Sequence, residues 1–307
     1  MKALRKIGIL AAVAVAVIGI AGCQNNAGAG GTPDTTTPAT VPEGFVKVPG
    51  KSIEGAESWS PSSNVFISGR RLEIKSFYMS DHEVTRAEYK EVMGSLPIHI
   101  ADAYDKDRDE LKGDAAGKNP VNRVSWYDAL VYCNKLSIKE NFTPCYKIDG
   151  KTNPVDWGSV PRSDNSTWNA AICDFTANGY RLPTEAEWEW AARGGENHTY
   201  AGSDTIDEVA WYTSNTSDTG TRDVRTKKEN GYGLYDMSGN VFEWCWDWMG
   251  DISNSTPATG SASGSNRCKR GGSWYYFASN AQVANRYYTD PSYRNYLIGF
   301  RLVRSAQ

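Results

Sequence analysis

Histidine, a common side chain in acid–base and metal chemistry at neutral pH, occurs three times in this sequence. His82, His99 and His198 lie far apart along the chain and show none of the spacings that metal sites use. The sequence also lacks a Gly-x-Ser-x-Gly nucleophile turn and a phosphate-binding glycine loop. These residues therefore predict neither a catalytic centre of these kinds nor a catalytic cofactor.

The cysteines leave two interpretations open. After Cys23 they are Cys133, Cys145, Cys173, Cys245 and Cys268, and no Cys-x-x-Cys pair indicates zinc. In an exported protein, Cys133 with Cys145, or Cys245 with Cys268, could form a disulfide. The alternative is that all five are small, buried thiols.

Tyrosine is the residue type whose placement is most informative. Of 17 tyrosines, six lie between Trp274 and Ile298, in a segment otherwise rich in Asn, Ser and Thr. This mixture is typical of antibody binding loops, in which rigid rings supply contact area and small polar side chains supply adaptable hydrogen bonds. Leu, Val and Ile, which a core stripe would need, are scarce here. The segment therefore predicts an exposed binding surface, with packing of the rings in the core as the alternative.

The residues between these tyrosines are of a different kind and are expected to be fixed. They are Ala278, Val283-Ala284-Asn285-Arg286, Pro291 and Arg294, while Ala281 and Ser292 fit either class.

The first 42 residues are predicted to be an export signal and a tether. Three basic residues precede an apolar run over residues 7–20, which is too short for a membrane-spanning helix. Residues 20–23, Ile-Ala-Gly-Cys, resemble a bacterial lipobox, so residues 1–22 would be removed and Cys23 lipidated. The alternative is an ordinary signal peptide followed by an incidental cysteine. Residues 23–42 hold almost nothing to bury and are expected to be flexible.

Composition places the rest of the chain, residues 43–307, among globular proteins. The sequence of 307 residues is 40% hydrophobic and 22% charged, and its 11 tryptophans predict a Trp-rich core. A net charge of −3 gives no indication of nucleic-acid binding. No second low-complexity break occurs, which favours one domain.

Helix caps and periodicity predict two helices in the first half of that domain. Thr85 can cap a helix over Arg86–Met93 that ends at Gly94. Ser125 begins a second helix. Its apolar stripe consists of Trp126, Leu130, Cys133 and Leu136.

A third helix is predicted after Thr184, with Glu187 as its capping-box partner. Glu185, Glu187 and Glu189 alternate along it and do not face one another, which argues against a catalytic carboxylate pair. Short strands are expected over Gly44–Val48, Leu72–Met79 and Gly299–Val303, with loops elsewhere.

Blocks of residues in a fixed order resemble the formylglycine-generating-enzyme, or sulfatase-modifying, domain over residues 43–304. The blocks are Phe77-Tyr78-Met79 with Glu83-Val84-Thr85; Asn119-Pro120-Val121 with Val124-Ser125-Trp126 and Ala129; Arg181 to Glu189 with Ala191 to Gly195; Gly233 to Val241 with Glu243-Trp244; and Arg270 to Trp274 with Gly299-Phe300-Arg301. The resemblance implies an α+β, loop-rich variant of the C-type lectin fold. Few helices, short strands and neighbouring chain ends go with that fold.

Two parts of the resemblance concern chemistry. Enzymes of the family use a copper-binding cysteine pair after the Gly-Gly-Ser block, and the matching positions here are Tyr276 and Ala281. Neither can supply a thiolate, so the resemblance implies a scaffold without oxidase activity. A structural calcium ion in the family implies Asp236, Gly239, Val241 and Glu243 as oxygen ligands, with a plain turn as the alternative.

The Tyr-rich segment, residues 274–298, also resembles the variable region of proteins diversified by a diversity-generating retroelement. In such systems a template is copied with errors at adenines, and an altered AAC codon never yields Lys, Glu, Gln, Met or Trp. The positions predicted to vary hold none of these: Tyr275, Tyr276, Phe277, Ser279, Asn280, Tyr287, Tyr288, Thr289, Asp290, Tyr293, Asn295, Tyr296 and Leu297.

The resulting expectation is a surface-displayed binding lipoprotein of a bacterial cell envelope, on the outer membrane. Its partners would be the membrane, through the lipid anchor, and an unknown ligand outside the cell, a protein or other macromolecule. The alternatives are a structural or fixed-ligand envelope lipoprotein and, less favoured, an oxidase of the formylglycine-generating type.

Overall fold

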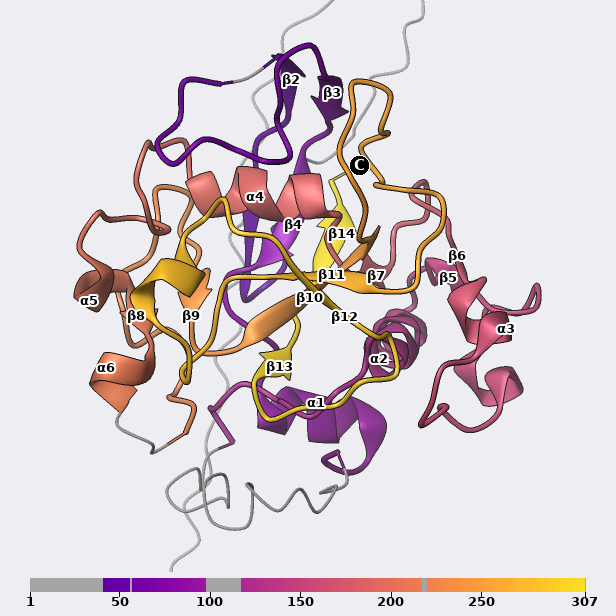
Figure 1. Cartoon of the computed structure of the whole chain (residues 1–307). Coiled ribbons are helices and arrows are strands. Elements are labelled where there is room, and N and C mark those ends of the chain that lie inside the picture. Colours follow the sequence, from indigo (N-terminus) through magenta and orange to yellow (C-terminus); the bar gives the residue numbers. More distant parts are fainter. Residues whose placement is uncertain (1–40, 56, 98–116, 217–219, 307) are drawn as a thin grey trace, which may run out of the picture. The chain divides into compact units, whose positions relative to one another are not determined.

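The first of two four-stranded sheets joins the two ends of the domain. The computed structural model describes residues 41–55, 57–97, 117–216 and 220–306. The sheet has the order β1 (Phe45–Val48), β4 (Phe77–Ser80), β14 (Val303–Ser305) and β7 (Tyr180–Arg181). Both β1 and β14 pair antiparallel with β4, so the first and last strands lie on either side of it; Figure 1 shows β14 next to β4.

The second sheet carries the Tyr-rich segment. Its order is β12 (Tyr287–Thr289), β11 (Arg267–Arg270), β10 (Phe242–Trp248) and β13 (Ile298–Gly299). β11 pairs antiparallel with β10 and β12, and β13 is parallel to β10. Three further two-stranded pairs are β2 (Lys51–Glu54) with β3 (Arg71–Ile74), β5 (Tyr146–Lys147) with β6 (Ile172–Cys173), and β8 (Ala210–Trp211) with β9 (Ser238–Gly239).

The three predicted helices are confirmed, together with their caps. They are α1 (Arg86–Met93), α2 (Trp126–Lys139) and α4 (Glu185–Arg193). Each begins with a capping box in which the N-cap hydroxyl and the acidic side chain three residues later satisfy backbone N–H groups reciprocally. Gly94 and Gly194 end α1 and α4 in left-handed conformation. Segments expected to be loop contain the short helices α3 (Ser166–Asn169), α5 (Ile206–Val209), α6 (Thr213–Thr216), η1 (Pro154–Trp157) and η2 (Ala278–Ala281).

Two predicted strands are divided in the structure. Leu72–Met79 is not one strand, because β3 pairs with β2 whereas β4 pairs with β1 and β14. Gly299–Val303 is likewise shared between β13 and β14, which belong to different sheets. In both cases the chain changes partners within an apolar run, and hydrophobicity alone does not mark that point.

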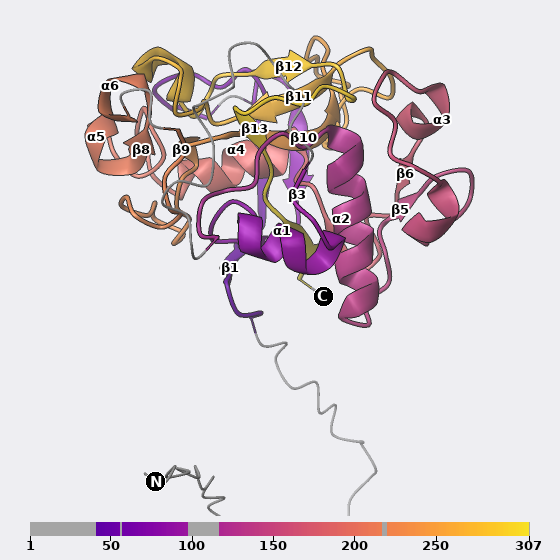
Figure 2. The ribbon, with the colours of Figure 1, turned by 90° about the horizontal axis from the view of Figure 1, so that it is seen from below.

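The core is rich in tryptophan, as predicted. Trp126, Trp188, Trp244 and Trp274 are fully buried. Their indole N–H groups find acceptors; for example, Trp244 donates to the Val124 carbonyl at 2.9 Å. Figure 2 shows residues 271–298 along the upper surface of the domain, with α1 and most of α2 below.

The five cysteines after Cys23 are free thiols, which corrects the disulfide alternative. Four are buried and Cys173 is half-buried. None of the helices within the described ranges combines the length and apolar character that a bilayer crossing requires. The predicted signal peptide (1–22), Cys23 and almost all of the predicted tether (23–42) lie outside the described residues.

Candidate functional site

The side chains predicted to vary are exposed or half-buried, with one exception. Five of their aromatic rings, Tyr275, Tyr276, Phe277, Tyr288 and Tyr293, are 37% to 72% exposed. Ser279 is also exposed. The half-buried positions are Asn280, Tyr287, Thr289, Asp290, Asn295 and Tyr296. We call these twelve residues the display face.

Leu297 does not belong to the display face, which corrects the prediction for that residue. Its side chain is 7% exposed and packs in the core cluster that contains Trp274 and Phe300. The reason is its backbone, because the Leu297 carbonyl accepts a hydrogen bond from the Phe242 N–H at 2.7 Å and leads directly into β13.

The small and apolar residues expected to be fixed are mostly buried beneath the display face. Trp274, Val283, Ala284 and Pro291 are buried, whereas Ala278 remains half-buried. Ala281, which fitted either class, is also buried. Ala281 lies so close to Gly272 that a Cβ at Gly272 would come within 2.9 Å of its Cα. These contacts hold the segment while leaving its exposed side chains free to differ.

Two arginines in the segment attach it to the scaffold. Arg286 donates through Nε and Nη2 to the Glu185 carboxylate, both at 2.8 Å. Arg294 donates through Nε to Asp128 Oδ2, also at 2.8 Å. Both carboxylates lie in the first turn of a helix, α4 and α2 respectively, so each arginine fixes the segment to a helix N-terminus.

The alternating glutamates of α4 have structural roles, as the sequence indicated. Arg270 bridges Glu185 at 3.1 Å and Glu189 at 2.7 Å in a fully buried network. Glu187 instead caps the helix and pairs with Arg181. Burial alone would raise the pKa of Glu185, but the charges of Arg270 and Arg286 outweigh it and hold the pKa below its usual value.

A buried phenylalanine supports the centre of the display face. The rings of Tyr276 and Tyr287 contact Phe242 edge-on, with centroids 5.2 and 5.1 Å away. Tyr287 also accepts a hydrogen bond from the Asn280 amide at 2.7 Å. Display-face residues therefore contact one another and rest on a strand that is part of the scaffold.

The two positions that the family resemblance assigns to the copper-binding cysteines hold no thiol. Tyr276 is exposed on the display face and Ala281 is buried beneath it. Cys245 and Cys268 lie in β10 and β11, and burial raises the pKa of both thiols above its usual value. A buried, protonated thiol is neither a nucleophile nor a copper ligand.

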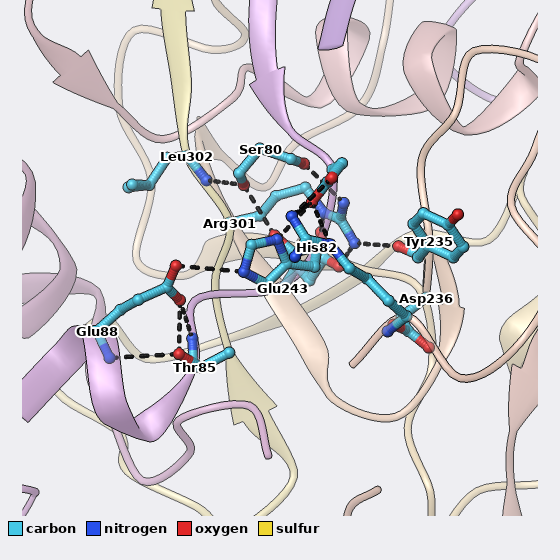
Figure 3. Close-up of polar contacts among 11 residues, drawn as sticks. Ser80, His82, Thr85, Glu88, Tyr235, Asp236, Glu243, Arg301 and Leu302 are labelled. Carbon is cyan, nitrogen blue, oxygen red and sulfur yellow. Dashed lines mark hydrogen bonds and ion pairs between the residues drawn. The ribbon is translucent and has the colours of Figure 1, made fainter. Parts of the chain in front are cut away.

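The two described histidines are paired with carboxylates. His82 lies between Asp81, 2.5 Å from Nδ1, and Glu88, 3.3 Å from Nε2 (Figure 3). Burial lowers the pKa of His82, but its hydrogen bonds to both carboxylates outweigh that effect and raise it. His198 contacts Asp204 on the surface, and His99 lies outside the described residues. Neither described histidine is paired with a nucleophile.

The residues that match the family's calcium ligands do not fit an ion in this arrangement. Both Glu243 oxygens accept hydrogen bonds at 2.7 Å from Arg301 (Figure 3). Trp188 donates to one of them at 2.6 Å. Freeing Glu243 for calcium would leave a buried guanidinium unpaired. Among the described residues, no group of three or more His, Cys, Asp or Glu side chains is arranged as a metal site.

The other three predicted ligands are held by the protein through some of their atoms only. Asp236 accepts the Arg225 N–H at 2.8 Å through one oxygen, and its other oxygen has no hydrogen-bond partner. Burial raises the pKa of Asp236 to about 6. Gly239 pairs with Trp211 in the β8–β9 ladder, and Val241 donates its N–H to Glu83 at 3.0 Å. The guanidinium of Arg301 already supplies, beside Glu243, the positive charge that a calcium ion would bring.

Chelation should therefore leave the melting temperature unchanged. A calcium ion bound only by the folded state would stabilise it by mass action, and removing the ion would lower the melting temperature. We expect superimposable thermal unfolding curves with excess EDTA and with millimolar calcium. A calcium-dependent rise that is lost in Asp236→Asn would show that Arg301 releases Glu243 to the ion.

Two proteins of known sequence or structure are similar to this chain over most of their own length. A relative from Paenibacillus barcinonensis, named chaperone protein LppX, is 36% identical over 94% of this chain and 96% of its own length. The solved structure of Treponema denticola variable protein 1 superposes with a TM-score of 0.73 and 38% identity, covering 85% of this chain and 94% of that one.

An enzyme is also among the relatives. The formylglycine-generating enzyme of Mus musculus is 34% identical over 240 residues, which are 67% of this chain and 59% of that enzyme. Residues 31–306 match the sulfatase-modifying factor enzyme 1-like domain. The chain therefore belongs to that domain family and has the formylglycine-generating-enzyme subtype of the C-type lectin fold.

Proposed function

We propose that this chain is a lipid-anchored binding protein whose display face is diversified on a fixed scaffold. The observation that carries the proposal is the separation of residues by burial within one short segment. Side chains predicted to vary are exposed or half-buried, except Leu297, whereas most of the side chains expected to be fixed are buried or ion-paired. Substitutions at exposed positions usually cost little stability, so this arrangement tolerates change where contact with a ligand occurs.

The exposed rings support a macromolecular ligand outside the cell. Five aromatic side chains on one segment make a surface that water solvates poorly, and such patches mark interaction sites. Tyrosine and phenylalanine lose few rotamers on binding, which suits them to contact a protein surface. The similarity to Treponema denticola variable protein 1 points the same way.

The lack of a thiol pair favours binding over oxidation. By the family resemblance, Tyr276 and Ala281 stand where the enzymes carry cysteines, and the described cysteines that remain are mostly buried. Without a thiolate the chain has neither the copper ligands nor the nucleophile of that chemistry. We infer that the display face occupies the place of the enzymes' active site.

Randomising the display face tests the proposal. All twelve positions are encoded by codons derived from AAC through changes at its adenines, and the library is displayed on yeast. We expect most clones to resist a protease that digests unfolded chains, and sorting against lysozyme as a model protein should enrich binders.

A second library provides the matched control. It randomises buried positions of the same segment: Trp274, Ala281, Val283, Ala284 and Pro291. We expect most of its clones to be digested. Equal digestion of both libraries would mean that the side chains of the display face are needed for folding. The protein would then be a structural lipoprotein or one that binds a fixed ligand.

Lipidation of Cys23 is the prediction for the anchor. Cells fed a radiolabelled fatty acid should label the wild-type protein but not Cys23→Ser, and the variant should leave the membrane fraction. Two acyl signals on one residue are enough for stable anchoring without a transmembrane helix. Cys173→Ser serves as the control and should label normally; equal labelling of the Cys23 variant would refute the anchor.

A further inference from the structure

The scaffold presents one cation to the display face that nothing in the described protein neutralises. Lys269 lies in the middle of β11, opposite Trp244 on β10 and opposite Tyr287 on β12. Its ammonium group lies 4.3 Å from the centroid of the Phe242 ring, the ring on which Tyr276 and Tyr287 pack. Lys269 is half-buried, and Phe242 is 1% exposed.

The other cations around this sheet differ from Lys269. Arg270, Arg286 and Arg294 each form an ion pair with a carboxylate. Arg267 stacks between Trp126 and Trp248 and donates to two backbone carbonyls. Lys269 has no hydrogen bond and no ion pair within the described ranges, and burial alone lowers the pKa of its ammonium to about 8.

Lys269 has lost part of the water around its ammonium group without gaining an anion, and this desolvation is unfavourable. Binding of an anion at this position would therefore be favourable. A carboxylate brought to it restores a charge-assisted hydrogen bond, and the surrounding rings exclude the water that would weaken it. The rings contribute flat apolar contact on either side. The complementary ligand surface is therefore a carboxylate flanked by apolar groups.

We propose that Lys269 is a fixed anchoring cation of the display face and binds a carboxylate of the partner protein, from an Asp or Glu side chain or a chain terminus. The inference deepens the proposed function and rests on it for the nature of the partner. Because Lys269 precedes the segment 274–298, it stays in place whatever the display face carries. Variation would then act around one constant charge.

Benzoate is the probe, since it joins a carboxylate to one ring, and benzamide is its neutral counterpart. The full chain is dimethylated at lysine amines with ¹³C-formaldehyde, which keeps each amine basic, and the Lys269 signal is assigned by its loss in Lys269→Arg. We expect benzoate to shift that signal saturably and to raise the pKa of Lys269. Benzamide should do neither, and Lys269→Met should weaken benzoate binding, followed by the Tyr ring signals, at least tenfold.

Lys227 is the matched control. Its ammonium lies 4.1 Å from the Trp211 ring centroid but also donates to the Asp207 carbonyl. Its signal should not move with benzoate. Equal shifts at Lys227 and Lys269, equal effects of benzoate and benzamide, or tighter binding of phenyl phosphate than of benzoate would overturn the proposal.

This outcome is separable from that of the randomised libraries. If the display-face library unfolds but Lys269 binds benzoate, Lys269 is a carboxylate-binding residue of a fixed-ligand site. If the library folds but Lys269 ignores benzoate, the display face stands without this anchor.

Discussion

Trp274→Ala should lower the free energy of unfolding by about 3–5 kcal/mol. The indole is 0% exposed and packs in the larger core cluster, so its removal leaves a cavity that the neighbouring rings cannot fill. The backbone N–H of Trp274, which alanine keeps, donates to the Asn240 carbonyl at 2.8 Å. The variant therefore removes the indole and leaves this attachment of the segment in place. Urea denaturation followed by circular dichroism gives the difference.

Phe277→Ala is the matched control for that measurement. Phe277 lies three residues further on and is 72% exposed, so its truncation should change the free energy of unfolding by no more than about 0.5 kcal/mol. A large ring is removed in both variants, and only burial differs. Similar losses for both would contradict the division of the segment into a core side and a display side.

Glu185→Gln should be comparably destabilising, by about 3–5 kcal/mol, because it removes one charge from a buried network. Its carboxylate serves Arg270 and Arg286 together, and the amide leaves Arg286 without its ion-pair partner. Since the pKa of Glu185 is lowered in the folded state, its stabilising effect is present at neutral pH and lost as the pH falls through the acid range. The variant should therefore show a weaker loss of stability on acidification than the wild type.

Glu91→Gln is the control for the ion pair. Glu91 pairs with Lys139 on the surface, where both side chains are largely exposed, and its neutralisation should cost less than about 1 kcal/mol. Equal costs at the two sites would mean that Arg286 is not anchored through Glu185.

The sequence was most informative where structure is decided locally. Thr85, Ser125 and Thr184 each precede an acidic residue by three positions, and the capping box needs only that spacing. The Tyr-rich composition likewise predicted the exposed surface, because it depends on residue types and not on partners. The ordered family blocks supplied the fold, which composition does not specify.

Contacts between residues far apart in the sequence could not be predicted. Nothing local shows that Arg286 reaches Glu185, 101 residues away, or that Arg294 reaches Asp128. The burial of Leu297 follows from the strand that begins at the next residue. Lys269 was not singled out, because its significance depends on Phe242 beneath it and on the pairing of β12 with β11. The run Arg267-Cys268-Lys269-Arg270 does not alternate polar and apolar residues, so the sequence did not place Lys269 on one face of a sheet.

The DNA on either side of the gene tests the central claim, diversification of the display face, most directly. Sequencing it should reveal a near-copy of the stretch that encodes residues 274–298. We expect the gene and the copy to differ only where the copy has adenine, and the differing codons to be those of the display face. The absence of such a copy, or differences spread over all four bases and over the codons of buried residues such as Trp274 and Val283, would contradict it.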